Sequence, residues 1–170
     1  MKRTLILGSL SLVAFAACTT SGEDRPDSTT AERSFRAADR ALQTALGALD
    51  AHARVAPVTG NVNLTSPCST AGSIGISGTY DNTDAGTSFD LIAAFSGCHE
   101  AEGTLDGSLH WTSVTTAAGH EDDHWSGNLD FSDQYGSWSC PYAVHMVSVN
   151  GATTEYTGTI CGYDVSGIGD

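Results

Sequence analysis

The sequence is poor in basic residues. Seven Lys and Arg stand against 20 Asp and Glu among 170 residues, for a formal net charge of -13, and none follows Arg54. Nucleic-acid binding needs a basic surface that neutralises phosphates. Electrostatic binding to anionic lipid head groups needs one as well. The charge balance therefore argues against both kinds of partner.

Regular repeats are also missing. The 19 Gly follow no period and no heptads occur, which excludes a collagen-like chain and a coiled coil. A hydrophobic content of 40% with 8% aromatic residues argues against a fully disordered chain. At this length we expect one globular domain plus tails.

The N-terminal apolar segment is too short to span a bilayer as a helix. Lys2 and Arg3 precede residues 4–17, which are apolar or small, and this order is typical of a signal peptide. The segment runs into Ala14-Phe15-Ala16-Ala17-Cys18, which resembles the cleavage and lipidation box of bacterial lipoproteins.

The resemblance to bacterial lipoproteins implies a cellular location. It implies that residues 1–17 are removed and that the Cys18 thiol carries diacylglycerol, which anchors the protein to a membrane. Because Thr19 rather than Asp follows the anchor, the sorting pattern of that family implies the outer membrane in a Gram-negative cell. An ordinary secreted protein with a chance cysteine is the alternative.

The mature chain begins with a tether and a helix. Residues 18–29 are predicted to form a flexible tether, and residues 30–54 an amphipathic helix that begins at a capping box of Thr29 and Glu32. A membrane-surface role of its apolar side is the alternative to packing. The apolar stripe consists of Phe35, Ala38, Leu42, Ala45, Leu46, Leu49 and Ala53.

Charge divides the mature chain into two parts. Without residues 1–17 the balance becomes 5 − 20 = −15, and from Val55 to Asp170 there are 14 acidic residues and no Lys or Arg. We therefore expect arginines of the helix to help dock it on an acidic β domain. The remaining basic residues are Arg25, Arg33, Arg36, Arg40 and Arg54.

Residues 61–165 are predicted to form an antiparallel β domain. The hydrophobic period changes to two, and Gly, Asn, Asp or Ser clusters separate most of the segments. The predicted fold class is mainly β with one N-terminal helix: a meander of about seven strands, curved as a half-barrel or sandwich-like, with the helix packed on it. The predicted strands are 61–67, 72–80, 87–97, 103–115, 124–132, 137–149 and 152–161.

Four predicted strands share an apolar-x-Gly-x-apolar core. Alternation places each glycine on the inward face, where a strand glycine indicates a close approach or a bend. We expect the helix or an aromatic ring to pack over this row, with a ligand groove as the alternative. The glycines are Gly78, Gly107, Gly127 and Gly158.

Four cysteines remain after Cys18 and allow three disulfide connectivities. Residues 149–152 carry a two-residue hairpin signal. In that register Cys140 faces Cys161 at a non-hydrogen-bonded position, within disulfide reach. Pro141 lacks an N–H and predicts a bulge that shifts the register.

The second disulfide, Cys68–Cys98, follows by elimination. Both residues end strands at the same end of a meander. Metal-binding thiols are the alternative, but an exported chain without a Cys-x-x-Cys pattern argues against them.

A zinc motif competes with this non-catalytic interpretation. Residues 120–130 match H-E-x-x-H-x-x-G-x-x-D and so resemble the extended motif of metzincin peptidases. The resemblance implies that His120, His124 and Asp130 hold Zn²⁺ and that Glu121 is the general base.

The local pattern favours a strand over the helix that this chemistry requires. Apolar and polar residues alternate over 124–132, and in a strand His124 and Asp130 lie ~20 Å apart. We therefore expect a solvated acidic hairpin tip at 119–124, with adventitious divalent binding as an alternative. The sequence predicts no catalytic residue, no resident metal and no cofactor.

The other histidines predict little chemistry. His99 with Glu100 and Glu102 is a candidate acid–base cluster in a turn. His110 and His145 fall in strands and are expected to be surface or packed residues rather than ligands. The leading hypothesis is a lipid-anchored envelope protein with a structural or binding β domain, whose protein or glycan partner the sequence does not name. A small zinc peptidase is the alternative.

Overall fold

The computed structural model describes residues 26–55 and 59–167. The predicted signal peptide, Cys18 and most of the predicted tether lie outside these residues. The described chain forms one long helix, eight strands and a short 3₁₀ helix, η1 (Val165–Gly167). Within it, no helix is both long and apolar enough to cross a membrane. The main elements are α1 (Ser28–Val55), β1 (Gly60–Pro67), β2 (Ala71–Thr83), β3 (Gly86–His99), β4 (Thr104–Thr116), β5 (His120–Asp133), β6 (Gly136–Val149), β7 (Ala152–Ile160) and β8 (Tyr163–Asp164).

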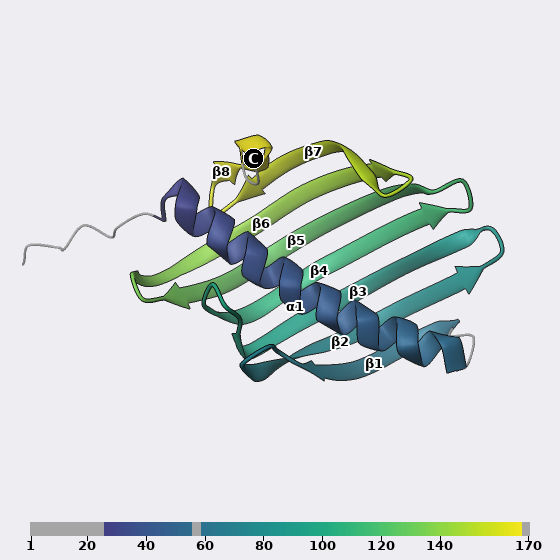
Figure 1. The fold of residues 1–170 in the computed structure, drawn as a ribbon, viewed down its shortest axis with the longest axis horizontal. Coiled ribbons are helices and arrows are strands. Elements are labelled where there is room, and N and C mark those ends of the chain that lie inside the picture. Colours follow the sequence, from purple (N-terminus) through teal and green to yellow (C-terminus); the bar gives the residue numbers. More distant parts are fainter. Residues whose placement is uncertain (1–25, 56–58, 168–170) are drawn as a thin grey trace, which may run out of the picture.

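The strands form one open sheet in sequence order, and every neighbouring pair is antiparallel. Helix α1 lies diagonally across one face of this curved sheet (Figure 1). The predicted class, mainly β with one N-terminal helix on an antiparallel meander, is confirmed. The described strands form one sheet rather than a sandwich, and the short β8 adds a strand to the predicted seven.

The helix begins two residues earlier than predicted, at a different cap. The Asp27 carboxylate accepts hydrogen bonds from the Thr30 backbone N–H at 2.7 Å and from the Thr30 hydroxyl at 2.8 Å. This contact satisfies one of the free N–H groups of the first turn. The capping box of Thr29 and Glu32 was wrong, because Glu32 pairs instead with Arg36 one turn along the helix.

The core lies between α1 and the concave face of the sheet, which we call the trough face. Trough residues alternate along the strands with residues of the opposite, outer face. The buried side of α1 includes residues outside the predicted stripe, since Ala31, Ala37 and Ala41 are fully buried. Small side chains dominate that side and let the helix approach the sheet closely. Its fully or nearly fully buried residues are Ala31, Ser34, Ala37, Ala38, Ala41, Leu42, Ala45 and Leu49.

The four strand glycines have backbone conformations and close approaches that other residues would not tolerate. All four have positive φ, between 112° and 145°, a conformation that only glycine adopts readily. Gly107 and Gly127 are exposed, so neither the helix nor a ring covers them, contrary to expectation. A Cβ atom on Gly127 would lie 2.4 Å from the Ser108 carbonyl oxygen of the neighbouring strand.

The disulfides join Cys68 to Cys98 and Cys140 to Cys161, as predicted. The Cys140–Cys161 pairing was correct, although the β6–β7 register from which it was predicted holds only next to the turn. The β6–β7 register starts at Val149↔Ala152 but shifts by one residue between Ser148 and Val147, so the bulge lies near the turn rather than at Pro141.

Two ion pairs attach the helix to the acidic sheet, as the charge division predicts. The Arg33 guanidinium lies 2.9 Å from the Asp133 carboxylate, and that of Arg40 lies 2.6 Å from Glu102. The side chain of Asp133 is only 6% exposed, so it depends on Arg33 for neutralisation. Arg36 pairs within the helix and does not contribute to docking.

Removing Arg33 is expected to destabilise the protein more than removing Arg36. Arg33→Ala leaves a buried carboxylate without its partner, which costs about 2 kcal/mol of unfolding free energy. Arg36→Ala removes an exposed pair within one helix, worth about 0.5 kcal/mol. Urea unfolding of both variants measures the difference, and equal losses would contradict the docking role of Arg33.

Candidate binding site

The zinc motif predicted from residues 120–130 is not assembled. These residues form β5, so His120, His124 and Asp130 follow one another along the outer face. His124 and Asp130 are six residues apart, which is ~20 Å in a strand. Glu121 belongs to the opposite, trough face. The expected acidic hairpin tip at 119–124 was also wrong, because β5 already begins at His120 and pairs with β6 there.

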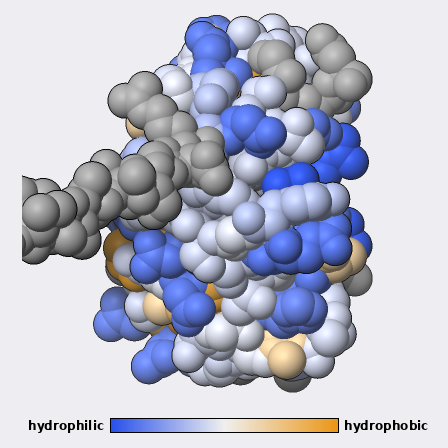
Figure 2. Space-filling view, turned by 90° about the vertical axis from the view of Figure 1, so that its left-hand side faces the viewer, coloured by the Kyte–Doolittle hydropathy of each residue, from blue (hydrophilic) through white to orange (hydrophobic). Residues whose placement is uncertain are grey.

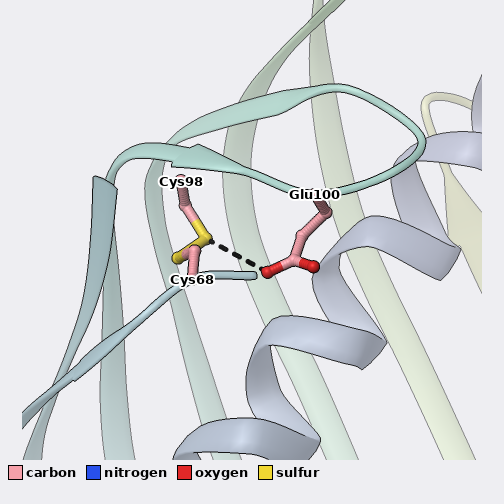
Figure 3. Close-up of side chains that lie close together, drawn as sticks. All are labelled: Cys68, Cys98 and Glu100. Atoms are coloured by element: carbon pink, nitrogen blue, oxygen red, sulfur yellow. Dashed lines mark hydrogen bonds between the residues drawn. A yellow bond between two sulfur atoms is a disulfide. The ribbon is translucent and has the colours of Figure 1, made fainter. Parts of the chain in front are cut away.

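The three residues of the predicted acid–base cluster, His99, Glu100 and Glu102, do not interact with one another, because each has a different partner. His99 contacts the Thr104 hydroxyl at 2.8 Å, and Glu102 pairs with Arg40. Glu100 is fully buried beside the Cys68–Cys98 disulfide (Figure 3) and accepts hydrogen bonds from the backbone and hydroxyl of Ser69. Glu100 therefore ties the β1–β2 loop to the β3–β4 loop.

A groove of about 640 Å³ lies between the β3–β4 loop and the β5–β6 turn. Figure 2 looks onto this end of the molecule and shows mainly hydrophilic to intermediate colours with small hydrophobic areas. The groove's charged groups are already partnered, since Arg33 contacts Asp133 and packs 4.9 Å from the ring centre of Tyr135. The groove is open, and Glu102, which also lines it, pairs with Arg40 through Oε1 while its buried Oε2 has no hydrogen bond.

A smaller pocket lies beside the helix, over β5, β6 and β7. Its volume is about 40 Å³, room for about one to three water molecules or the ammonium end of a ligand. Phe35 lies one helical turn before Asp39, so both project from the same flank of α1. The pocket is lined by Phe35, Asp39, Asp123, Trp125, Val144, Met146 and Tyr156.

Aromatic rings form the walls of this pocket. The ring centres of Phe35 and Trp125 are 5.7 Å apart, and those of Phe35 and Tyr156 are 5.8 Å apart. Trp111 packs behind Trp125 at 5.8 Å. Ring faces at these separations give cations and CH groups a favourable surface.

Two polar atoms of the pocket have no partner. The indole N–H of Trp125 and the hydroxyl of Tyr156 are both buried without a hydrogen bond, and Trp125 as a whole is only 6% exposed. Buried polar groups are nearly always hydrogen-bonded, because leaving one unpaired costs about 1–3 kcal/mol. The two atoms therefore mark positions where a ligand or water completes the structure.

Two carboxylates provide negative charge at the same place. Burial raises the pKa of Asp39, although a hydrogen bond from Gln43 and the nearby Arg40 charge act in the opposite direction. Burial also raises the pKa of Asp123, which accepts a hydrogen bond from the Trp111 indole at 3.3 Å. The pKa of the Tyr156 hydroxyl is raised by burial and by the neighbouring Asp39 charge.

The pocket combines groups suited to one class of ligand. Carboxylates and ring faces bind an organic ammonium group, while the Trp125 N–H donates to an oxygen acceptor. Sequence reasoning missed this pocket. The available signal was an acidic residue, Asp39, next to the apolar stripe, together with inward-facing aromatic residues on three strands.

Comparisons with known proteins identify no relative. The chain matches no protein-family model, no curated protein and no solved structure. A functional assignment therefore depends on the geometry of the chain itself.

Replacing Asp39 is expected to stabilise the folded protein at neutral pH. Because burial raises its pKa above the unfolded value, the ionised carboxylate carries a cost at pH 7. Asp39→Asn removes that cost, so its melting temperature should exceed that of the wild type at pH 7. The difference should shrink as the pH falls through the raised pKa and vanish below about pH 3.5, where the unfolded carboxyl is protonated too.

The control for this comparison is Asp84→Asn in the exposed β2–β3 turn, which should not change the melting temperature. Calorimetry between pH 3 and pH 8 makes the measurement. A variant of Asp39 that is less stable than the wild type at pH 7 would show that the carboxylate has a structural role.

Proposed function

We propose that this chain is a lipid-anchored envelope protein whose β domain is a non-catalytic binding module for a small organic ammonium compound. The ligand carries an oxygen acceptor beside its ammonium group, as an amino alcohol does. Its ammonium group lies between the carboxylates of Asp39 and Asp123, and its oxygen accepts the Trp125 N–H.

The observation that carries this proposal is the unpaired Trp125 indole N–H in a pocket that also holds two partly desolvated carboxylates. Both features cost folding free energy. Binding sites characteristically retain such costs, because the bound ligand compensates them. A pocket that served packing alone would contain apolar side chains at these positions.

The charge of the whole domain supports a cationic ligand. The β region has 14 acidic residues and no Lys or Arg after Arg54, so its potential attracts cations and repels anions. The Asp39 and Asp123 carboxylates are the only charged groups that line the described pocket.

The pocket residues support binding rather than catalysis. The described lining holds no serine, cysteine or lysine nucleophile and no histidine that would activate one. The general base implied by the zinc motif, Glu121, belongs to the other face of β5 from His120 and His124. We therefore propose no enzymatic activity.

The membrane anchor is supported by the sequence alone. Lys2 and Arg3 before an apolar segment that ends at Cys18 form the lipoprotein pattern, and two disulfides accord with an oxidising compartment. Thr19 favours the outer membrane within that pattern.

Ethanolamine is expected to bind the pocket with a dissociation constant of about 0.1–1 mM, since so small a ligand has few atoms for contact. n-Propylamine has the charge without the hydroxyl, and ethylene glycol has the hydroxyl without the charge, so both should bind at least tenfold more weakly. Isothermal titration calorimetry, with tryptophan fluorescence as a second signal, measures all three.

Variants of the protein test the ammonium group and the hydroxyl of the ligand separately. Asp39→Asn and Asp123→Asn should each weaken ethanolamine binding at least tenfold. Trp125→Phe should weaken ethanolamine but leave n-propylamine unchanged, because only the former uses the indole N–H. Asp84→Asn is the charge control. Equal affinity for ethanolamine and ethylene glycol, or unchanged binding by Asp39→Asn, would contradict the proposal.

Cys18→Ala is expected to release the protein from the membrane. In a Gram-negative host the wild type should enter the detergent phase and the outer-membrane fraction, while the variant should not. Thr19→Asp is the matched control, because it should keep the lipid yet move the protein to the inner membrane. Wild-type protein found in the aqueous phase would contradict the anchor.

A further inference from the structure

We propose that the outer face of the sheet holds a divalent transition-metal site, formed by Asp122 and His124 of β5 and His145 of β6. His124 and His145 are directly opposite in the β5–β6 register, and Asp122 precedes His124 by two residues on the same face. The sheet therefore brings two imidazoles and one carboxylate together on rigid backbone.

The geometry is close to that of a bound metal. The Asp122 Oδ1 atom lies 3.1 Å from His124 Nε2 and 3.0 Å from His145 Nε2. All three ligand atoms are within 4.8 Å of one another. Ligand atoms of a tetrahedral zinc ion are separated by ~3.3 Å, given bond lengths of ~2.0–2.1 Å. The two carboxylate–imidazole distances are thus already close to those around a zinc ion, and rotation of the histidine rings would bring the third pair of atoms within range.

The two imidazole rings lie side by side and need to rotate toward each other to bind one ion, because a metal lies close to the plane of each imidazole that binds it. They stack at a centroid distance of 4.3 Å with an interplanar angle of 3°, and both direct Nε2 toward the same carboxylate oxygen.

The donor set selects the kind of metal. Two imidazole nitrogens and one carboxylate oxygen suit Zn²⁺, Cu²⁺ or Ni²⁺, whereas Ca²⁺ and Mg²⁺ prefer oxygen ligands alone. The side chain of His124 is 58% exposed and that of Asp122 is 43% exposed. The ion would therefore keep at least one coordination position open to water or to an external ligand.

This site is distinct from both sites considered above. It shares His124 with the zinc motif but takes its second histidine from another strand. It also lies on the face opposite to the ammonium pocket, because Asp123 and Trp125 face the trough while Asp122 and His124 face outward. Loss of one site should therefore leave the other intact.

The test titrates the full chain with Zn²⁺ in competition with a chromophoric chelator, and with Co²⁺, whose visible spectrum reports the coordination geometry. We expect one Zn²⁺ per chain and an intense tetrahedral or five-coordinate Co²⁺ spectrum. His124→Ala, His145→Ala and Asp122→Asn should each lower zinc affinity more than ~100-fold, beyond the effect of outer-shell residues. Circular dichroism checks that each variant is folded.

The matched control is His110→Ala. His110 also lies on the outer face and contacts a carboxylate, Asp90 at 2.7 Å, but no second histidine joins that pair in the described structure. This variant should bind zinc like the wild type. His120→Ala tests the hairpin end of β5 and should also be neutral.

Three results would overturn the site. They are the absence of stoichiometric Zn²⁺ binding at 100 µM, unchanged affinity in a folded His145→Ala variant, and loss of binding in His120→Ala alone. Ethanolamine titration of Asp122→Asn provides the independent measurement, because retained ethanolamine binding with lost zinc binding separates this site from the proposed pocket.

Discussion

The fold depends on burial of one small-residue helix face in the trough of one sheet. No second sheet covers the apolar face among the described residues, so α1 provides most of the opposing core surface. Alanines bring helix and strands close together. Phe35 and Asp39 lie on the flank that faces β5 to β7, where the contact opens into the pocket. The packing that stabilises the sheet thus also positions the candidate site.

Much of the fold could be predicted because strand alternation and turn residues are local signals. The meander follows from short connections, and the disulfide partners follow from which strand ends meet. Details that depend on competition between neighbours were less accessible. Asp27 caps the helix in place of the predicted capping box, because its carboxylate accepts hydrogen bonds from Thr30. The bulge near Ser148 moves the β6–β7 register by one residue. The strand glycines indicated a bend, but their exposure depends on the path of the helix.

The sites were harder to predict than the fold, for a physical reason. The pocket residues come from four elements, and each one alone has the pattern of a core residue. Their unusual property, polar atoms without partners, exists only after packing. The pairing of His124 with His145 could have been predicted from the sequence. The β5–β6 register runs from Asp133↔Gly136 at the turn to His124↔His145, so extending that hairpin would have found it. The zinc motif pairs His124 with residues of the same segment, whereas in the sheet its partner, His145, lies on the neighbouring strand.

Because residues of β5 alternate between the two faces of the sheet, the proposed pocket and the proposed metal site depend on the same strand register. Asp122 and His124 face outward while Asp123 and Trp125 face the helix, so consecutive residues serve opposite surfaces. A slip of one residue in strand pairing would exchange the two faces and remove both sites at once. An insertion or deletion within this strand is therefore far more damaging than a substitution. Point changes can remodel one surface without disturbing the other, so the two chemistries are free to evolve separately on a single segment of chain.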